Sequence, residues 1–413
     1  MERASTSPGP RGRAWIASGA GMISMLGVAQ ICSWGTLYYA FPLIAEAMRA
    51  ELGWSKDALY GAASLGLALS GIAAYPIGAA IDAGRGRMVM TLASLAAGAL
   101  FVAWSQVSSL WALYVVFGGI GCLQAATLYD PAFAVVARRF GPLNARRAIT
   151  QLTLWGGFAS TVFVPLIQWL IDGFGWRGAL VVLGATNIVL CAGLYYAAID
   201  PARDHVEPAA GHAPERAEGA VREVMRMPVF WALALAFVAY ATASSALTFH
   251  FYPLLIERGL TASGAVLVFS VIGPAQVAGR VVVWLLAGNA PVGRIGSLVV
   301  IAFPLSILGF AYAPPEILPL VLTAAVYGAA NGMMTIVRGL SVPEMVSRKA
   351  YGAINGAITT PMRFVQALAP VAVAWLWTLG GSYDLAIAAI LAATVLQAAG
   401  FWVAALMARR PAG

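Results

Sequence analysis

The sequence is poor in charged residues: only 10% of its 413 residues are Asp, Glu, Lys or Arg, whereas 61% are hydrophobic. An ordinary soluble domain carries about 25% charged residues. Even a domain of about 300 residues buries only about 75% of the surface of its unfolded chain, so charges this scarce could not solvate the rest. The composition excludes a soluble globular protein and predicts that lipid surrounds most of the chain.

Cysteine and histidine are scarce as well. The three cysteines lie in apolar runs without C-x-x-C spacing, which argues against a disulfide framework and a metal cluster. The chain has no H-E-x-x-H, G-x-S-x-G or P-loop motif, so we expect no enzyme, no metal and no cofactor. The formal charge of +8 could indicate nucleic-acid binding, but arginines on one side of a membrane give the same excess, and we expect no nucleic acid.

Apolar runs long enough to cross a bilayer recur along the chain. A hydrocarbon core about 30 Å thick needs about 20 apolar residues of helix. The first uncharged run, 14–44, is longer than the core of a signal peptide and predicts a membrane helix. The whole pattern predicts an all-α membrane protein with twelve transmembrane helices. They are expected at 14–44, 58–81, 88–105, 110–136, 149–170, 178–198, 228–256, 263–287, 296–313, 317–340, 353–378 and 384–407.

The distribution of Lys and Arg predicts the orientation. With the amino terminus in the cytoplasm, 18 of the 25 basic residues lie on the cytoplasmic side and four lie outside. We therefore expect a multi-pass protein of the cell (inner) membrane with both termini in the cytoplasm. The longest polar stretch predicts a linker that divides the chain six plus six. The expected parts are a tail at 1–13, a bundle at 14–198, the linker at 199–227, a bundle at 228–407 and a tail at 408–413.

The two halves also resemble each other. Phe41-Pro42-Leu43-Ile44 is interpreted as the close of the first helix, and Tyr252-Pro253-Leu254-Leu255 as the close of the seventh. Ser55 and Thr261 follow as candidate N-caps of the next helices. Such a parallel repeat of six helices places a binding site between the halves, near the middle of the membrane.

A charged loop follows the second predicted helix. The segment Gly78-Ala79-Ala80-Ile81-Asp82-Ala83-Gly84-Arg85-Gly86-Arg87 resembles the loop motif of the major facilitator superfamily, with Ala83 in place of the usual arginine. The resemblance implies a transporter made of two six-helix bundles. It also implies a gating latch, in which Gly78 allows close helix approach and Asp82 pairs with Arg85 or Arg87. The alternative is that these arginines only anchor the cytoplasmic face.

Within that superfamily the chain resembles the monocarboxylate transporter and oxalate/formate antiporter branch. The similarity lies in Gly53-Trp54-Ser55, Tyr129-Asp130-Pro131-Ala132, Gly175-Trp176-Arg177 and Arg280. It implies that Arg280 contacts a substrate carboxylate, that Arg363 matches a lysine of the oxalate exchanger, and that Tyr327 and Asn331 line the site. The fifth helix lacks the full glycine-proline pattern of drug/proton antiporters, which weakens the drug-efflux alternative.

Three charged residues lie deep in predicted helices. An ionised side chain at the bilayer centre costs about 2.5–3.5 kcal/mol, so Arg280 and Arg363 need negative partners, and Asp130 is the only acid at their depth. Two guanidinium groups against one carboxylate predict an anionic cargo, for which a small organic acid is the natural candidate and an inorganic oxyanion the alternative. The resemblance of Arg363 to the exchanger's lysine implies that the acid can carry two carboxylates. The alternative is that one arginine forms a structural bridge with Asp130. Arg338, near a helix end, is either a snorkelling anchor or functional.

Polar side chains at helical spacing complete the predicted site. Tyr327 and Asn331 share one face of the tenth helix, and Gln276 lies one turn before Arg280. Gln124 either contacts substrate or bridges helices. Tyr38 and Tyr39, opposite Phe249 and His250, form either an aromatic lid or part of the interfacial belt. The expected substrate-binding residues are Arg280, Arg363, Tyr327, Asn331, Gln124, Gln276, Tyr38 and Tyr39.

Asp130 and His250 are the candidates for proton coupling, although His250 is also readily explained as a hydrogen-bonded helix residue. The sequence therefore predicts a secondary transporter that works as a monomer. It would carry a small organic anion by alternating access, together with protons or in exchange for another anion. The alternatives are an efflux carrier of the same fold for drugs or other small molecules and, less favoured, a channel.

Overall fold

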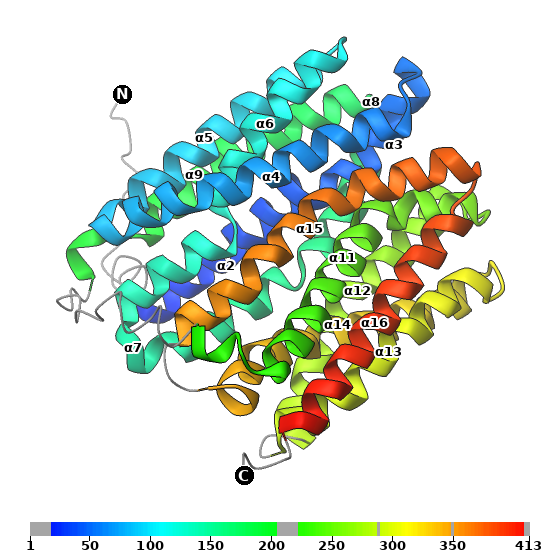
Figure 1. Ribbon diagram of the computed structural model, residues 1–413. Helices are drawn as coiled ribbons and strands as arrows, with labels where there is room; N and C mark the ends of the chain where they lie inside the picture. The colour runs from blue at the N-terminus through cyan, green and yellow to red at the C-terminus, as the bar shows by residue number, and fades with distance from the viewer. Residues whose placement is uncertain (1–17, 205–221, 287–289, 348–350, 409–413) are drawn as a thin grey trace.

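The computed structural model describes residues 18–204, 222–286, 290–347 and 351–408, and these ranges contain helices and no strand. Ten helical stretches in them are long and apolar enough to cross a membrane. Most of the helices run along one common direction (Figure 1). The predicted all-α membrane fold is confirmed.

The first half of the chain folds into α-helices interrupted by short π-helical turns. A π-helical turn, η1, interrupts the first helix at the point where Pro42 lacks a backbone N–H. The elements are α2 (Gly19–Trp34), η1 (Gly35–Tyr39), α3 (Ala40–Leu52), α4 (Lys56–Ala80), η2 (Ile81–Arg85), α5 (Gly86–Ser105), α6 (Leu110–Thr127), α7 (Tyr129–Gly156), α8 (Ala159–Ala185), η3 (Thr186–Cys191), α9 (Ala192–Ala198) and the 3₁₀ turn η4 (Pro201–Arg203).

The second half is simpler, because each crossing is one continuous helix. The predicted N-cap Thr261 accepts a hydrogen bond from the Gly264 amide at 3.2 Å, whereas the side chain of Ser55 makes no such bond at the start of α4. The elements are α11 (Pro228–Glu257), α12 (Ala262–Leu286), α13 (Val292–Tyr312), α14 (Ile317–Met345), α15 (Tyr351–Gly380) and α16 (Asp384–Ala408).

Two of the ten stretches each contain two crossings. The stretches Lys56–Ser105 and Arg147–Arg203 have 50 and 57 residues, about twice what one crossing needs. Each turns back at a glycine with positive φ, Gly84 at 82° and Gly175 at 66°. A side chain would strain that backbone, so glycine is the residue that allows the turn. Dividing the two stretches gives the twelve predicted crossings.

The first crossing is longer than predicted. It continues past Ile44 to Leu52, so the segment Phe41–Ile44 does not close it. The helix ends where Gly53 adopts φ 68° and its N–H bonds to the Arg49 carbonyl at 3.1 Å. The charges that begin at Glu46 mark the edge of the apolar region, but a helix outside lipid tolerates charge.

The helices pack as two groups of six. In the first group α4 packs on α6, α2 on α7 and α5 on α8. In the second group α12 packs on α14, α11 on α16 and α13 on α14. The groups meet along α4 with α15 and α8 with α12, with further contacts between α3 and α11. Figure 1 shows blue α4 beside orange α15. The predicted linker lies mostly outside the described residues.

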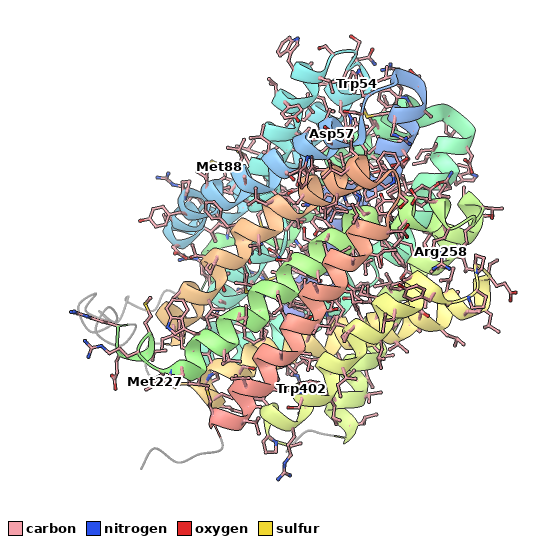
Figure 2. The ribbon with its side chains drawn as sticks, turned by 45° about the vertical axis from the view of Figure 1, so that its right-hand side comes forward. Trp54, Asp57, Met88, Met227, Arg258 and Trp402 are labelled. Atoms are coloured by element: carbon pink, nitrogen blue, oxygen red, sulfur yellow. The ribbon has the colours of Figure 1, made fainter. Side chains whose placement is uncertain are left out.

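The two ends of the molecule differ in their connections. We call the end where α2 begins and α16 ends the terminal end. We call the opposite end, which carries the turns at 53–55, 258–261 and 381–383, the loop end. Figure 2 shows Trp54 and Arg258 at the loop end and Met227 at the terminal end.

Prolines inside the helices shape the contact between the bundles. A helical proline lacks the N–H that would bond the carbonyl four residues earlier, and in lipid that carbonyl needs another partner. Pro253 frees the Phe249 carbonyl, which accepts from the Tyr60 hydroxyl at 3.1 Å. Pro274 frees the Ser270 carbonyl, which accepts from the Thr161 hydroxyl at 2.9 Å. Both bonds cross from the first bundle to the second.

The bundles approach most tightly beside the second of these bonds. A Cβ on Gly273 would lie 2.3 Å from Thr161 Oγ1 and 2.6 Å from the Gly157 carbonyl oxygen. The absence of a side chain at Gly273 therefore lets α12 lie directly against α8. Close packing and one hydrogen bond hold α8 and α12 together here.

Replacing Thr161 by valine tests the importance of a proline-freed carbonyl. Thr161→Val keeps the shape but leaves the Ser270 carbonyl without its donor, so we expect a loss of about 1 kcal/mol of stability. The measurement is thermal unfolding in detergent. Thr186→Val is the matched control, because the Val182 carbonyl that Thr186 contacts keeps its backbone N–H partner. Equal melting temperatures for the two variants would contradict this explanation.

Candidate functional site

A break in the fourth crossing positions Asp130. Leu128 is extended between α6 and α7, and Pro131 frees the Thr127 carbonyl. That carbonyl accepts hydrogen bonds from Gln30 Nε2 at 2.8 Å and the Tyr195 hydroxyl at 3.0 Å. Asp130 therefore lies in the first turn of α7, where the helix dipole favours a carboxylate.

Asp130 and Arg363 form an ion pair between the two bundles. Arg363 Nη2 on α15 donates to Asp130 Oδ2 at 2.6 Å. The side chain of Asp130 is 64% exposed, and that of Arg363 is 50% exposed. The bridge that the sequence left as an alternative for either arginine thus forms with Arg363. Because both side chains remain accessible, the bridge is open to competition from other charged groups.

Arg280 has no carboxylate partner in the described part of the chain. Its Nη1 donates to the Thr153 carbonyl at 2.9 Å, and its Nε donates to the Gly332 carbonyl at 3.4 Å. Its bond to Thr153 also joins the two bundles. None of the ion pairs among the described residues includes Arg280 or Arg338. The surplus of positive charge predicted from the sequence therefore remains after Asp130 is paired.

Tyrosines surround these arginines. The hydroxyls of Tyr39 and Tyr129 lie within electrostatic range of Arg280, and the hydroxyl of Tyr38 lies within electrostatic range of Arg363. These electrostatic contacts bring the predicted residues Tyr38 and Tyr39 of the first bundle together with both predicted arginines of the second.

Tyr240 and Tyr327 continue the cluster in the second bundle. The Tyr240 hydroxyl donates to Asn331 Oδ1, and both Arg280 and Arg338 act on it. Tyr327 is buried, and its hydroxyl has no hydrogen-bond partner among the described residues. Asn331 and Tyr327 thus lie at the same site as Arg280, as the sequence predicted. Arg338 also lies within electrostatic range of Tyr240.

Two aromatic residues of the site were missed from the sequence. The Trp34 ring lies 5.2 Å from that of Tyr38 and 4.9 Å from that of Tyr129, and its buried Nε1 has no partner among the described residues. Tyr240 is the other. The available signal was a polar aromatic side chain in the middle of an apolar helix, because such residues are costly in lipid and are often functional.

Aromatic side chains of the first crossing contact aromatic side chains of α11 and α12. Tyr38 and Phe249 meet edge to face with centroids 5.0 Å apart, and Tyr39 meets Phe269 in the same way at 6.1 Å. Phe41 also contacts Phe249, at 5.7 Å. All three contacts join the two bundles on the loop-end side of the arginines.

His250 is held from several sides. It is buried, stacks on the Tyr60 ring at 4.1 Å, and places Nδ1 2.9 Å from the Tyr383 hydroxyl and Nε2 2.8 Å from the Pro370 carbonyl. A carbonyl can only accept, so Nε2 carries the proton that binds the Pro370 carbonyl. Burial disfavours a second proton on the ring, so Nδ1 accepts from the Tyr383 hydroxyl.

The two predicted glutamines lie in different surroundings. Gln124 is buried, and its Nε2 donates to the Leu37 carbonyl at 2.7 Å inside the first bundle. This is the bridge between helices that the sequence allowed as an alternative. Gln276 is half-buried on α12, one turn from Arg280, and the α12 backbone there touches Gly332 of α14. Gln276 therefore lies beside Arg280, whereas Gln124 joins two helices of the first bundle.

The predicted latch is organised differently from the expectation. A Cβ on Gly78 would meet nothing within 4 Å, so Gly78 permits no close approach. The Arg87 guanidinium stacks over the Tyr196 ring at 3.6 Å within the first bundle. The Asp82 backbone carbonyl accepts from Arg138. No ion pair among the described residues includes Asp82, Arg85 or Arg87.

The sequence of this chain matches one family model and several curated proteins. Residues 26–370 match the model of the family described as Major Facilitator Superfamily. Monocarboxylate transporter 13 of Rattus norvegicus is 28% identical over 351 residues, which cover 83% of this chain and 77% of that protein. Monocarboxylate transporter 11 of Homo sapiens is 32% identical over 236 residues, which cover 54% of this chain and 47% of that protein.

Solved structures share the fold at low sequence identity. A bacterial homologue of the human lysosomal transporter Spinster, in an inward-facing and unoccupied conformation, is 17% identical with a TM-score of 0.70, covering 96% of this chain and 99% of that one. The nucleoside transporter NupG is 16% identical with a TM-score of 0.71, covering 95% and 100%.

Proposed function

This chain belongs to the major facilitator superfamily and is a multi-pass membrane transporter, and on that premise we propose that it carries a small organic anion bound by Arg280. The observation that carries the proposal is the charge of Arg280, which no protein carboxylate neutralises in the described residues. A guanidinium presents a planar fork of donors that matches a carboxylate. A bound organic acid would therefore supply the missing negative charge.

The surroundings of Arg280 suit such a cargo. Trp34 Nε1 and the Tyr327 hydroxyl are buried hydrogen-bonding groups without partners in the described residues. The Tyr39 hydroxyl lies within electrostatic range of Arg280. These groups offer apolar surface for the body of an acid and hydrogen bonds for its polar atoms. The curated relatives, which are named monocarboxylate transporters, support the same cargo class.

Coupling is assigned to Asp130. Its carboxylate is accessible and is paired with Arg363, so a bound anion can compete with Asp130 for that guanidinium. Once released from Arg363, the Asp130 carboxylate is free to bind another partner, and we assign the coupled proton to it. His250 is a poorer carrier because both of its ring nitrogens already have partners. Uptake with a proton and exchange of one anion for another both use this competition.

We propose that the terminal end faces the cytoplasm and that the protein acts as a monomer in the cell (inner) membrane. The excess of Lys and Arg on that side supports the orientation. The ring contacts Tyr38–Phe249 and Phe41–Phe249 lie on the loop-end side of the exposed Asp130 and Arg363, and we propose that these two side chains are reached from the terminal end. Rocking of the two bundles would then expose the same arginines to the other side.

Drug efflux by the same fold remains the second candidate. A carrier of organic cations would need an excess of acidic side chains at the site, which is the opposite of the charge around Arg280. A channel is distinguished by transport kinetics. Counterflow, in which unlabelled substrate inside vesicles drives accumulation of labelled substrate, occurs in a carrier and not in a channel.

Removing Arg280 is expected to weaken anion transport. Arg280→Ala removes charge-assisted hydrogen bonds worth about 1.5–3 kcal/mol, so kcat/KM for carboxylates should fall about 10- to 100-fold. The measurement is counterflow in proteoliposomes with a panel of mono- and dicarboxylates. Arg177→Ala is the control, because its bonds to Glu51 and to the Ser105 carbonyl lie at the loop end within the first bundle.

One outcome would contradict the proposed anion site. If Arg280→Ala and Arg363→Ala both fold and both transport organic acids at the wild-type rate, the anion site is wrong. Folding is checked by thermal unfolding in the same detergent, so that a loss of transport through misfolding is recognised.

Asp130→Asn separates proton coupling from exchange. Asparagine cannot bind the coupled proton, so uptake driven by a pH gradient should be lost while anion exchange continues. In the wild type, uptake should rise as the pH on the side of the substrate falls. The measurement is proton and substrate flux into the same liposomes. Asp172→Asn is the control at the loop end, and unchanged proton flux in Asp130→Asn would remove Asp130 from the mechanism.

A further inference from the structure

A charged side chain of the first bundle is enclosed by aromatic rings of the second at the loop end. Lys56, the first residue of α4, is only 3% exposed. Its Nζ lies 4.1 Å from the centroid of the Trp377 ring and 4.7 Å from that of Tyr383. The same nitrogen lies 3.1 Å from the Tyr383 hydroxyl. We call Trp377 and Tyr383 the cage.

The second bundle holds the cage in shape. Glu257 Oε2 accepts from Trp377 Nε1 at 2.6 Å, and Glu257 Oε1 accepts from the Tyr383 backbone N–H at 2.7 Å. His250 accepts from the Tyr383 hydroxyl at 2.9 Å. Burial and the carboxylates of Glu46 and Glu257 raise the pKa of Tyr383, so its hydroxyl keeps the proton that it donates. The rings therefore keep their places whether or not Lys56 is between them.

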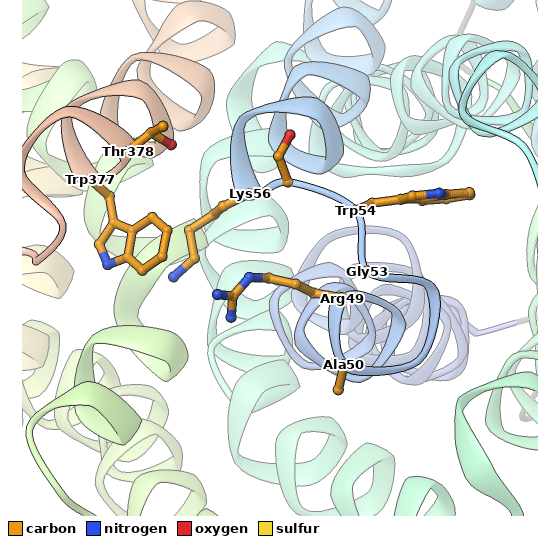
Figure 3. A pocket seen from close by; sticks show the side chains of 8 residues that line it. Arg49, Ala50, Gly53, Trp54, Lys56, Trp377 and Thr378 are labelled. Carbon is orange, nitrogen blue, oxygen red and sulfur yellow. The ribbon is translucent and has the colours of Figure 1, made fainter.

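The first bundle holds the lysine only loosely. Glu46 Oε1 lies 3.5 Å from Lys56 Nζ, and the lysine is the first residue of α4. A pocket of about 430 Å³ opens beside it, lined by Arg49, Trp54 and the cage residue Trp377 among others (Figure 3). Water in this pocket can hydrate the ammonium group as it leaves the rings. The cation–π contact is thus exchanged for hydration when the bundles part.

We propose that Lys56 and the cage form a latch that holds the loop end closed, and that Lys56 sets the rate at which this end opens during transport. Alternating access requires α4 and α15 to part at the loop end, and Lys56 must then leave Trp377 and Tyr383. A contact that is specific but cheap to break suits repeated opening. Lys56 is thus a positioning residue that touches no cargo. The inference uses the proposed transport cycle, but the latch itself can be measured without substrate.

Spin labels across the pocket test the latch directly. Ala50 and Thr378 line the pocket from opposite bundles, so Ala50→Cys and Thr378→Cys carry the labels in a chain whose three native cysteines are replaced by alanine. In Lys56→Met, which keeps the length and loses the charge, we expect the distance distribution to gain a longer component. Lys56→Arg, which still stacks on aromatic rings, should retain the short distance.

Arg177→Met is the matched control for the distance measurement. Arg177 lies at the same end, 38% exposed, stacks on Trp176 at 4.1 Å and pairs with Glu51 at 3.1 Å, all within the first bundle. Its loss removes a cation, a ring contact and an ion pair without touching the second bundle. The proposal is overturned if Lys56→Met keeps the wild-type distribution, or if Arg177→Met shifts it equally. Should Lys56→Met not fold, Trp377→Leu decides by the same criteria.

Transport kinetics supply a second readout. Loss of the latch should change the maximal exchange rate at least 3-fold and leave KM within 2-fold, because Lys56 does not touch the cargo. A change confined to KM would contradict the assignment. If no carboxylate is exchanged even by the wild type, the proposed cargo fails, while the spin-label distances still decide whether the latch exists.

Discussion

A polar group between apolar helices must find its partner inside the protein, because lipid offers none. Two hydrogen bonds between the two bundles follow from this constraint. Pro253 and Pro274 each free a carbonyl of the second bundle, and Tyr60 and Thr161 of the first bundle supply the donors. The prolines thus weaken single helices and at the same time create the hydrogen bonds that join one bundle to the other.

The same constraint also operates inside each bundle. Pro131 leaves the Thr127 carbonyl to Gln30 and Tyr195, and Pro370 leaves the Gln366 carbonyl to Ser245. In the first case the broken helix begins again at Tyr129, which gives the next residue, Asp130, a helix N-terminus in the middle of the molecule. The position of Asp130 therefore follows from the hydrogen bonds of the Thr127 carbonyl, and not from a contact between Asp130 and another charge.

Applied to the arginines, the constraint distinguishes two kinds of site. Arg363 finds a carboxylate, whereas Arg280 finds only backbone carbonyls. Carbonyl dipoles satisfy the hydrogen bonds of a guanidinium but leave its charge in place. The loop end is different, because Lys56 is matched there by aromatic faces and by Glu46. The ammonium group of Lys56 thus has a carboxylate beside it, whereas Arg280 has none among the described residues.

The sequence alone was enough for the membrane fold, the twelve crossings, the family and the three charges of the site. Length, apolar runs and isolated charges are local properties, and their physical cost in lipid does not depend on which helices become neighbours. Even so, it misjudged the end of the first helix, because charged residues end an apolar run without ending a helix. It also gave Gly78 a packing role that belongs to positions such as Gly273, since nothing local tells which glycine faces another helix.

Only the tertiary structure decided how those residues are paired. That Asp130 binds Arg363 and not Arg280, and that Lys56 lies between Trp377 and Tyr383, depends on helices that are more than two hundred residues apart in the chain. Such pairings follow from the packing of whole bundles, and no pattern along the chain encodes them. The sequence determined which charges lie in the membrane, and the fold determined which of them remains unmatched.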